Sequence, residues 1–475
     1  MSWLLIIGGL VVAYAFGASR NKAPVQPVSG VAPLTKQTLP KKLNVEREDI
    51  SNIDLSDEQK KVFEILETTS STVYITGKAG TGKSVLLQYF TEHTQKSVAV
   101  VAPTGVAALN VGGQTIHSFF KLAPEVLDPK EIKIDYKTKE ILRHVDAIVI
   151  DEVSMVRVDL MEAINVKMQL ACGNKLPFGG VQIIMFGDLY QLPPVVTDGQ
   201  LQRYFDHTYG GVFFFNAPVF KERQLKIYEL NYIFRQKDPE FRELLNAIRN
   251  GVDTESALLK INERQNVTMP EDGFVTLAGT NATVSGINSA KLAKLPGDIH
   301  TYVAEITGDI QQSAFPTEKE LKLKVGSQVM MLKNDLKKPA RWVNGTLAVI
   351  TKLTSDSIRV NIDGVEHSVS RESWDKIRYN YNHEEIKLEK EIVSSFKQFP
   401  MRLAWAITIH KSQGQTYESV AIDLTDGAFV HGQTYVALSR CKSMDGIYLK
   451  SPIRSQDIII DQEIIEFMKG AEVTK

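Results

Sequence analysis

The hydrophobic pattern of the first half of the chain alternates between short apolar runs and segments with helical periodicity. Four of these runs are STVYIT (71–76), SVAVVA (97–102), DAIVID (146–151) and IIMFGD (183–188). Short apolar runs separated by helices are typical of a parallel sheet that is covered on both faces. FVTLAG (274–279) and SVAIDL (419–424) predict a second sheet of the same kind. The pattern therefore predicts an α/β fold with two parallel sheets.

Between those last two runs the pattern changes to short strands without intervening helices. These strands are SQVMMLKN (327–334), TLAVITKL (346–353), SIRVNI (357–362) and VEHSVS (365–370). Asn344-Gly345 and Asp363-Gly364 have the composition of two-residue hairpin turns. We interpret residues 321–395 as a small antiparallel barrel inserted in the second α/β domain.

The N-terminus begins with an apolar segment, Trp3 to Ala18, which Arg20 and Lys22 follow. It is shorter than the roughly 20 residues that a membrane-spanning helix needs, and it lacks the positive start of a secretory signal. Because the basic residues follow the apolar run, we favour a helical membrane anchor at residues 1–18, with the body of the protein on the cytoplasmic side. A cleaved signal and a peripheral or buried helix stay open as alternatives. Residues 19–50 lack periodicity and are interpreted as a flexible tether.

Composition adds few constraints. A chain of 475 residues accommodates about three domains. Its formal net charge of -1 argues neither for nor against a nucleic-acid partner, so any basic surface is local. The two cysteines, Cys172 and Cys441, lie far apart and outside any Cys-x-x-Cys pattern. They predict neither a disulfide framework nor a zinc site, and they fit a reducing compartment.

A glycine-rich loop, GKAGTGKS (77–84), follows the first apolar run and precedes a helical pattern. It matches GxxxxGK[ST] at every fixed position, in the strand–loop–helix context of a phosphate-binding loop. Its glycines allow backbone N–H groups to surround phosphates at a helix N-terminus; they are Gly77, Gly80 and Gly82. We expect Lys83 to reach the β- and γ-phosphates and the Ser84 hydroxyl to bind Mg²⁺. The loop therefore predicts ATP and Mg²⁺ as ligands.

Two further strands end in polar residues that suit in-line phosphoryl transfer. Asp151 is placed to hold Mg²⁺, and Glu152 to activate the attacking water. In MFGDLYQLPPV (185–195), Gln191 can donate and accept hydrogen bonds. We therefore expect it to bind the γ-phosphate and to transmit its presence to a neighbouring surface, with Asp188 in support. Without the phosphate loop, a solvated strand edge and a polar turn would explain these residues equally well.

The segment LSDEQKKVF (55–63) has two interpretations. Ser56 and Gln59 fit a helix capping box. Alternatively, Gln59 recognises the edge of an adenine. A capping role would occupy the amide that adenine needs, so the sequence leaves both open.

The segment APTGVAALNVGGQTIHSFF (102–120) contains candidates for contact with a nucleic-acid backbone. Backbone N–H groups and hydroxyls of a loop can hold phosphates without reading sequence. We therefore propose Pro103, Thr104 and His117 as DNA-binding residues. Phe119 and Phe120 are either core residues or rings that stack on bases.

Seven segments in series carry a resemblance to a known family. They are GKAGTGKS, VVAPTGVAALNVGGQTIHSFF, IDEVSM, FGDLYQLPPV, LNYIFRQ, ITIHKSQGQT and YVALSRCKS. In this order they resemble the superfamily-1 DNA helicases that move 5′ to 3′, and more narrowly the petite integration frequency (PIF-type) family with its phage and RecD-type relatives. The resemblance covers about residues 51–450.

The resemblance implies a fold with defined domain boundaries. Two RecA-like P-loop NTPase lobes are expected, the first at residues 51–225 and the second at 226–320 and 396–475. The insertion at 321–395 is expected to be an SH3-like β-barrel, and residues 119–143 are expected to form a wedge that splits the duplex. ATP would lie between the lobes and single-stranded DNA across their top.

The resemblance also implies roles for a polar row in the second lobe. DNA contacts are expected from His410, Lys411 and Ser412, and nucleotide contacts from Gln413 and Gly414. A row that touches both ligands suits an element that couples them, since a ligand drives motion only by binding two states with different affinity.

Two arginines are expected to complete the site from the second lobe. By resemblance, Arg235 and Arg440 reach across the cleft to the γ-phosphate, where a guanidinium stabilises transition-state charge. Together with Lys83, Glu152 and Gln191 they form the expected catalytic set. A single arginine without this context would be more readily explained as a surface ion pair.

These expectations combine into one hypothesis and three alternatives. The hypothesis is a monomeric ATP-driven motor that translocates 5′ to 3′ on single-stranded DNA and unwinds duplex at junctions. The resemblance implies genome maintenance as its process, including DNA repair, recombination, replication and telomere maintenance. The alternatives are a membrane-associated ATP-binding switch or scaffold, an RNA helicase and a RecD-type subunit. A scaffold would need none of the five catalytic residues, which favours the motor.

Overall fold

The structure is a computed structural model that describes residues 55–475. Single residues or short stretches within that range are not described, namely 197, 222–224, 237, 271–272, 311, 313–314, 336, 338–339, 383–386, 471–472 and 475. The predicted anchor at residues 1–18 and the tether at 19–50 lie outside the described part. Within the described part, no helix has the length and apolar character needed to cross a membrane.

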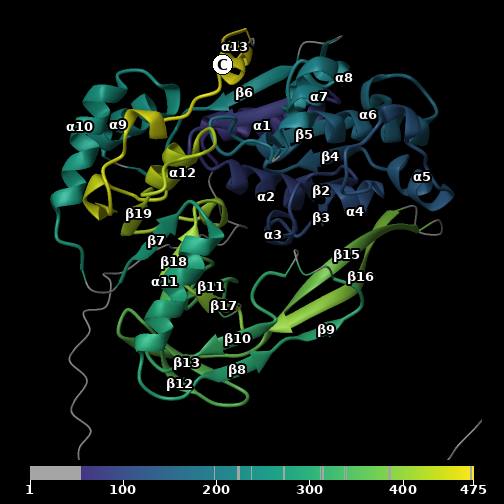
Figure 1. The fold of residues 1–475 in the computed structure, drawn as a ribbon. Helices are drawn as coiled ribbons and strands as arrows, with labels where there is room; N and C mark the ends of the chain where they lie inside the picture. Colours follow the sequence, from purple (N-terminus) through teal and green to yellow (C-terminus); the bar gives the residue numbers. More distant parts are fainter. Residues whose placement is uncertain are drawn as a thin grey trace, which may run out of the picture. The chain divides into compact units, whose positions relative to one another are not determined.

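The first sheet contains seven strands in the order β21-β6-β1-β5-β4-β2-β3, and every neighbouring pair is parallel (Figure 1). The strands are β1 Val73–Gly77, β2 Val98–Ala102, β3 Gln114–Thr115, β4 Ala147–Ile150, β5 Gln182–Phe186, β6 Lys226–Leu230 and β21 Val473–Thr474. The helices that accompany them are α1 Asp57–Thr68, α2 Lys83–His93, α3 Gly105–Asn110, α4 Ile116–Phe120, α5 Tyr136–Leu142, α6 Val158–Cys172, α7 Gly199–Tyr209 and α8 Pro218–Lys221. The four runs predicted as strands form β1, β2, β4 and β5, which confirms the predicted parallel sheet.

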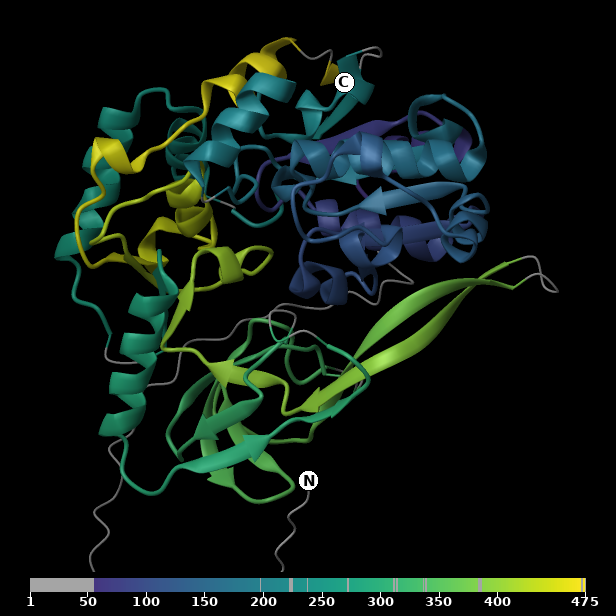
Figure 2. The ribbon, with the colours of Figure 1, turned by 45° about the vertical axis from the view of Figure 1, so that its right-hand side comes forward.

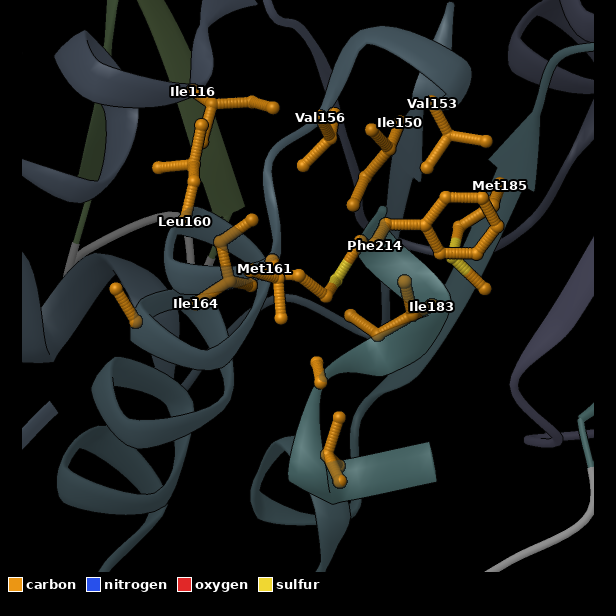
Figure 3. Close-up of a cluster of buried hydrophobic side chains, with 14 of the residues drawn as sticks. Ile116, Ile150, Val153, Val156, Leu160, Met161, Ile164, Ile183, Met185 and Phe214 are labelled. Carbon is orange, nitrogen blue, oxygen red and sulfur yellow. The ribbon is translucent and has the colours of Figure 1, made fainter. Parts of the chain in front are cut away.

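Both faces of this sheet are buried, because successive residues of each strand enter opposite cores. Ile148 and Ile150 of β4 belong to one hydrophobic cluster, while Ala147 and Val149 belong to the other. In the first cluster, Figure 3 shows side chains from β4 and β5 gathered beside those of α6 and of the segment around Phe214. The sheet is thereby fixed on both sides, and the loops at the carboxyl ends of its strands have a rigid base.

The second sheet contains four parallel strands in the order β18-β7-β19-β20. They are β7 Val275–Ala278, β18 Ala406–Thr408, β19 Val420–Asp423 and β20 Ile447–Leu449. The helices of this region are α9 Pro239–Asn250, α10 Thr254–Asn262, α11 Asn281–Lys294 and α12 Gln433–Ser439. Every residue of α12 is buried, so this short helix lies inside the molecule. The two runs predicted for this sheet form β7 and β19.

Between α11 and β18 the strands are antiparallel. Five of them pair in the order β14-β13-β12-β11-β17, with bounds β11 Gln328–Met331, β12 Leu347–Leu353, β13 Ile358–Ile362, β14 Val365–Val369 and β17 Met401–Leu403. Asp363 and Gly364 join β13 to β14 with φ of 50° and 86°, which confirms the predicted two-residue turn. Asn344 and Gly345 also form a turn, in which Thr346 N donates to Val343 O at 3.1 Å. It is not the predicted two-residue hairpin connection, because a longer loop joins β11 to β12 and the turn lies at the end of that loop.

A long two-stranded ribbon projects from the same region. It consists of β15 Glu372–Asn382 and β16 Lys387–Gln398, to which β9 Glu305–Thr307 adds a third strand. A separate pair is formed by β8 His300–Val303 and β10 Glu320–Leu323. Figure 2 shows the ribbon extending beyond β9, and β15 lies against α3, α5 and β3 of the first sheet's layer. The ribbon was not predicted.

The C-terminal residues return to the first sheet. Helix α13 Gln462–Gly470 places Ile464 in the first hydrophobic cluster, and Phe467 stacks on Phe215 with ring centroids 4.0 Å apart. Strand β21 then pairs with β6 at the edge of the sheet. The end of the chain therefore contributes to the first core.

Candidate active site

The phosphate-binding loop lies between β1 and α2, in the predicted context. Gly80 and Gly82 adopt φ of 85° and 78°, a region that favours glycine. Space also requires glycine, because a Cβ on Gly80 would lie 2.4 Å from the Cβ of Arg235. Phe234 N donates to Gly80 O at 2.8 Å. The segment NYIFRQ therefore packs directly on the phosphate loop.

Lys83 begins α2 and turns back into the loop. Its Nζ donates to Gly77 O at 2.6 Å and to Lys78 O at 3.1 Å. Burial lowers the pKa of Lys83, while the charges of Asp188 and Glu152 act in the opposite direction. The ammonium group is thus held at the loop by carbonyl oxygens and faces acidic groups from two neighbouring strands.

Two adjacent carboxyl groups follow β4. Glu152 has a φ of 49°, which is unusual for a residue with a side chain. Burial and the neighbouring Glu152 raise the pKa of Asp151 to about 7. Burial also raises the pKa of Glu152, and the charges of Lys83 and Arg440 oppose that rise. A carboxylate influenced by Lys83 and Arg440 lies where groups of the two sheets meet.

The residues predicted for Mg²⁺ fit that ion. Ser84 is solvent-exposed at the second position of α2, and Asp151 is a half-buried carboxyl group repelled by its neighbour, so a divalent cation would stabilise its charge. Within the described part of the chain, no cluster of three or more His, Cys, Asp and Glu residues is placed to hold a metal. Mg²⁺ usually takes only one or two protein ligands and completes its shell with water and phosphate, which agrees with this arrangement.

Gln191 belongs to a buried polar network after β5. Its Nε2 donates to Asp188 Oδ2 at 3.3 Å, and Arg249 Nη2 donates to Asp188 Oδ1 at 3.1 Å. Burial would raise the pKa of Asp188, but Arg249 and Lys83 hold it below its ordinary value. Asp188 therefore supports Gln191 directly, and it is itself held by a residue of α9.

Arg235 and Arg440 come together at one place. Arg440 is buried and donates from Nε to Val436 O at 3.0 Å and from Nη1 to Ser412 O at 3.3 Å. Arg235 is half-buried and donates to Ser439 O at 3.3 Å. Burial, and after it the charge of Arg440, lowers the pKa of Arg235. Because a guanidinium stays protonated in proteins, two such groups side by side favour an anion between them.

The polar row after β18 forms a short 3₁₀ helix, His410–Ser412, and its members face different ways. Lys411 and Gly414 are exposed, and His410 and Gln413 are half-buried. The Ser412 side chain is fully buried, and its hydroxyl donates to Ile409 O at 2.7 Å. This burial corrects the expectation for Ser412, whose hydroxyl is not presented to DNA and whose carbonyl instead accepts from Arg440.

The DNA-binding candidates near β2 and α4 belong to the layer whose elements α3 and β3 contact β15. Pro103 and Thr104 follow β2, and Thr104 Oγ1 accepts from Ala107 N at 3.2 Å at the start of α3. His117 in α4 is half-buried, and burial lowers its pKa. The rings of the two phenylalanines that follow, Phe119 and Phe120, are buried in the first cluster, which decides the alternative left open in favour of core residues.

Gln59 forms the capping box. Its Oε1 accepts from Ser56 N at 3.0 Å, and Ser56 Oγ accepts from Gln59 N at 3.3 Å. Its Nε2 donates to Gly82 O at 3.3 Å. The amide is thus occupied at both ends while touching the phosphate loop. Recognition of adenine by Gln59 stays a prediction.

Sequence reasoning missed three residues that join the site from the second half of the chain. Tyr435 Oη accepts from Ala79 N at 3.1 Å, His431 Nε2 lies 2.9 Å from Leu189 O, and Arg249 binds Asp188. A signal existed only for Arg249, which occupies a position on the apolar face of α9. That face has the helical spacing of an apolar stripe and otherwise consists of Phe241, Leu244, Leu245 and Ile248.

Comparison with known proteins identifies the family. Residues 54–257 match the model of the PIF1-like helicase family, and residues 305–353 match that of the DNA helicase Pif1 2B domain. The ATP-dependent DNA helicase Pif1 of Bdellovibrio bacteriovorus is 33% identical over 435 residues, which cover 89% of this chain and 93% of that protein. The chain belongs to the PIF1-like helicase family. The human ATP-dependent DNA helicase PIF1 is a 31% identical member, and the match covers 90% of this chain but only 65% of the human protein.

Solved structures of the PIF1-like family resemble the whole described part of the chain. Unliganded Pif1 from Bacteroides sp. is 37% identical with a TM-score of 0.79, and the match covers 88% of this chain and 97% of that chain. At the same identity and coverage, the Bacteroides sp. Pif1 complex with ADP-AlF4 gives 0.81. Bacteroides Pif1 bound to ssDNA gives 0.65 at 38% identity. The present structure is therefore closer to the first two than to the one bound to ssDNA.

Proposed function

We propose that this chain is an ATP-dependent DNA helicase that translocates 5′ to 3′ on single-stranded DNA and unwinds duplex ahead of it. The observation that carries the proposal is the position of Glu152. Its carboxyl group is influenced at once by Lys83 of the phosphate loop and by Arg440 of the second sheet's layer. A base in the field of both a phosphate-binding lysine and an arginine suits phosphoryl transfer.

Hydrolysis would use the residues of the first sheet in separate roles. The backbone N–H groups of the loop and Lys83 would bind the phosphates, while Ser84 and Asp151 would hold Mg²⁺. When bound, Mg²⁺ neutralises phosphate charge. Glu152 would accept the proton of the attacking water as its oxygen bonds to the γ-phosphorus and the bond to the ADP oxygen breaks.

Coupling to movement would use the residues of the second sheet. Arg235 and Arg440 would bind the γ-phosphate only while it is attached, so its loss would remove their common partner. Arg440 also donates to Ser412 O, which connects the nucleotide site to the row that contains His410 and Lys411. This contact supports Gln413 and Gly414 as neighbours of the nucleotide and the exposed end of the row as a DNA contact.

The DNA path that we propose combines both parts of the chain. Pro103, Thr104 and His117 would hold the backbone of the strand from the first lobe, with His410 and Lys411 on the second. The domain division that we propose is that of the sequence, with lobes at 51–225 and at 226–320 with 396–475, an SH3-like insertion at 321–395 and a wedge at 119–143. The bounds need correction at three places, because β6, α13 and β21 join the first sheet and its core, and because β8 and β9 before residue 321 and β17 after residue 395 pair with strands of the insertion. The contact of β15 with α3 and β3 supports a part for the insertion in enclosing the strand.

The proposed partners are nucleic acids, and the proposed process is genome maintenance. Single-stranded DNA and duplex junctions are the proposed substrates of a monomeric motor in genome maintenance. The solved complex of Bacteroides Pif1 with ssDNA supports the choice of DNA. The membrane anchor at residues 3–18 stays a prediction from the sequence.

Unwinding of tailed duplexes tests this function. We expect a duplex with a 5′ single-stranded tail to be separated in the presence of ATP and Mg²⁺, and a duplex with a 3′ tail to stay intact. K83A, which removes the phosphate-binding ammonium, should abolish both unwinding and DNA-stimulated ATP hydrolysis. Unwinding from the 3′ tail, or undiminished hydrolysis by K83A, would overturn the proposal. An RNA-tailed duplex separates a DNA motor from an RNA motor.

A further inference from the structure

Arg249 is a buried cation that the proposed reaction does not use directly. Only 5% of the residue is exposed, although it lies on the apolar face of α9. Burying a charge is costly unless it is paired. Its Nε has no hydrogen-bond partner among the described residues, so the side chain is not fully satisfied. Packing alone therefore gives no reason for an arginine at this position.

The partners of Arg249 all belong to the loop that carries Gln191. Its Nη2 donates to Asp188 Oδ1 at 3.1 Å, and the guanidinium carbon lies 3.9 Å from the centre of the Tyr190 ring. The second carboxylate oxygen, Asp188 Oδ2, accepts from Gln191 Nε2 at 3.3 Å. A continuous chain of contacts therefore runs from α9 through Asp188 to the Gln191 amide.

Residues near α12 hold the same loop from another side. His431 Nε2 lies 2.9 Å from Leu189 O, and His431 Nδ1 accepts from Asp461 N at 2.9 Å. Because Nδ1 accepts, Nε2 carries the proton and donates to the loop. At Gly432 a Cβ would lie 2.4 Å from Tyr190 O, so only glycine allows this approach. Side chains and backbone from the second half of the chain therefore contact the loop after β5.

We propose that Arg249 is a positioning residue through which the second lobe sets the Gln191 amide at the γ-phosphate. This inference rests on the proposed function and deepens it. In this proposal the Arg249–Asp188 pair connects α9 to the loop after β5, so that the two move together. The second lobe would then respond to the γ-phosphate through two sets of contacts. One is made by Arg235 and Arg440, and the other by the loop that Arg249 holds.

The charges near Asp188 predict that loss of Arg249 alone has a different effect from loss of the whole Arg249–Asp188 pair. Asp188 lies in the field of two cations, Arg249 first and Lys83 second. Without Arg249, the buried Asp188 carboxylate would lose the cation that is paired with it and keep only the charge of Lys83 nearby. Removing Arg249 alone should therefore be more harmful than removing Arg249 and the Asp188 charge together.

Steady-state ATP hydrolysis with saturating single-stranded DNA tests the proposal in the full chain. R249M keeps the length of the side chain and removes the charge, and we expect kcat to fall about 10-fold or more. KM for ATP should change by less than about 3-fold, since a positioning residue does not bind the nucleotide. R249K should recover only part of kcat, because an ammonium cannot donate in a fork or stack on Tyr190 as a guanidinium does.

The double variant R249M/D188N separates a charge-specific role from a role in packing. We expect it to have a higher melting temperature and a higher kcat than R249M, because no unpaired buried carboxylate remains. K260M is the matched control, since Lys260 of α10 forms an exposed ion pair with Glu240 of α9, the helix that carries Arg249, and it should behave as wild type.

Three outcomes would overturn the inference. They are wild-type kcat in R249M, full recovery of kcat by R249K, and a double variant no better than R249M. Failure of the proposed function itself would be seen separately, as K83A that still hydrolyses ATP. If K83A is inactive and R249M is wild-type, only the inference about Arg249 is wrong.

Discussion

The ends of β4 and β5 lie side by side in the first sheet, and each carries acidic side chains that are at least half-buried, but their surroundings differ. After β4, Asp151 and Glu152 are adjacent carboxyl groups, and burial raises the pKa of both. After β5, Asp188 is paired with Arg249, which with Lys83 holds its pKa below the ordinary value. The carboxyl groups after β4 are therefore available to bind a cation and to accept a proton. The carboxylate after β5 holds the loop that carries Gln191.

The comparison shows that the neighbouring charges, rather than the position on the sheet, determine the role of each carboxyl group. An opposite charge with hydrogen bonds favours the ionised form, whereas burial beside a like charge disfavours it. The largest effect of losing a carboxylate is therefore expected on hydrolysis at the end of β4 and on stability at the end of β5. Three variants test that contrast.

The largest expected effect is on hydrolysis at the end of β4. E152Q keeps the shape of the side chain but cannot accept the proton of the attacking water, so we expect kcat to fall about 10²- to 10⁴-fold. Binding of ATP should persist because Lys83 and the loop are unchanged. Single-turnover hydrolysis and equilibrium nucleotide binding measure the two quantities. A variant with wild-type turnover would remove Glu152 from the role of base.

The next effect is on stability at the end of β5. D188N leaves the buried Arg249 guanidinium without its counter-charge, which costs about 3 to 5 kcal/mol when one partner of a buried pair is removed. Denaturant unfolding without nucleotide measures this loss. E240Q, which breaks the exposed pair with Lys260, is the control and should cost about 0 to 1 kcal/mol. Equal stability of D188N and E240Q would contradict the contrast.

The smallest effect has the opposite sign. Because its pKa is raised to about 7, Asp151 binds more protons in the folded than in the unfolded protein, so its contribution to stability falls as pH rises from about 4 toward 7. Without Mg²⁺ or nucleotide, D151N should therefore melt about 1 to 3 °C above wild type at neutral pH. The gain should shrink at lower pH. A melting temperature below that of wild type would show that the Asp151 carboxylate is stabilised by the fold.

Local sequence patterns predicted the first sheet and its loops because each unit is built from neighbouring residues. The phosphate loop, the residues after β4 and the turn at Asp363-Gly364 follow from short-range rules on glycine, strand ends and hairpins. The ribbon β15–β16 did not follow, since NHEEIKLEKE lacks the apolar alternation of a strand with one buried face. Asn344-Gly345 forms a turn but not a two-residue hairpin connection, because the same dipeptide can end a longer loop.

Long-range contacts account for what the sequence left open at the site. The Ser412 carbonyl accepts from Arg440, which is 28 residues away, and the Gln59 amide donates to Gly82, which is 23 residues away. Arg249 and Asp188 are 61 residues apart, and only folding brings them into contact. The apolar stripe of α9 indicated that an arginine there was unusual, but it did not identify the partner.

The central claim is that the second lobe completes the nucleotide site with Arg440. The most direct measurement is kcat for ATP hydrolysis by R440A with saturating single-stranded DNA, together with the affinity for a fluorescent ATP analogue. The account predicts a fall in kcat of about 10³-fold or more with nucleotide affinity little changed, while K442M, which breaks the partly exposed pair with Glu418, keeps wild-type values. Hydrolysis by R440A at the rate of K442M would contradict the account.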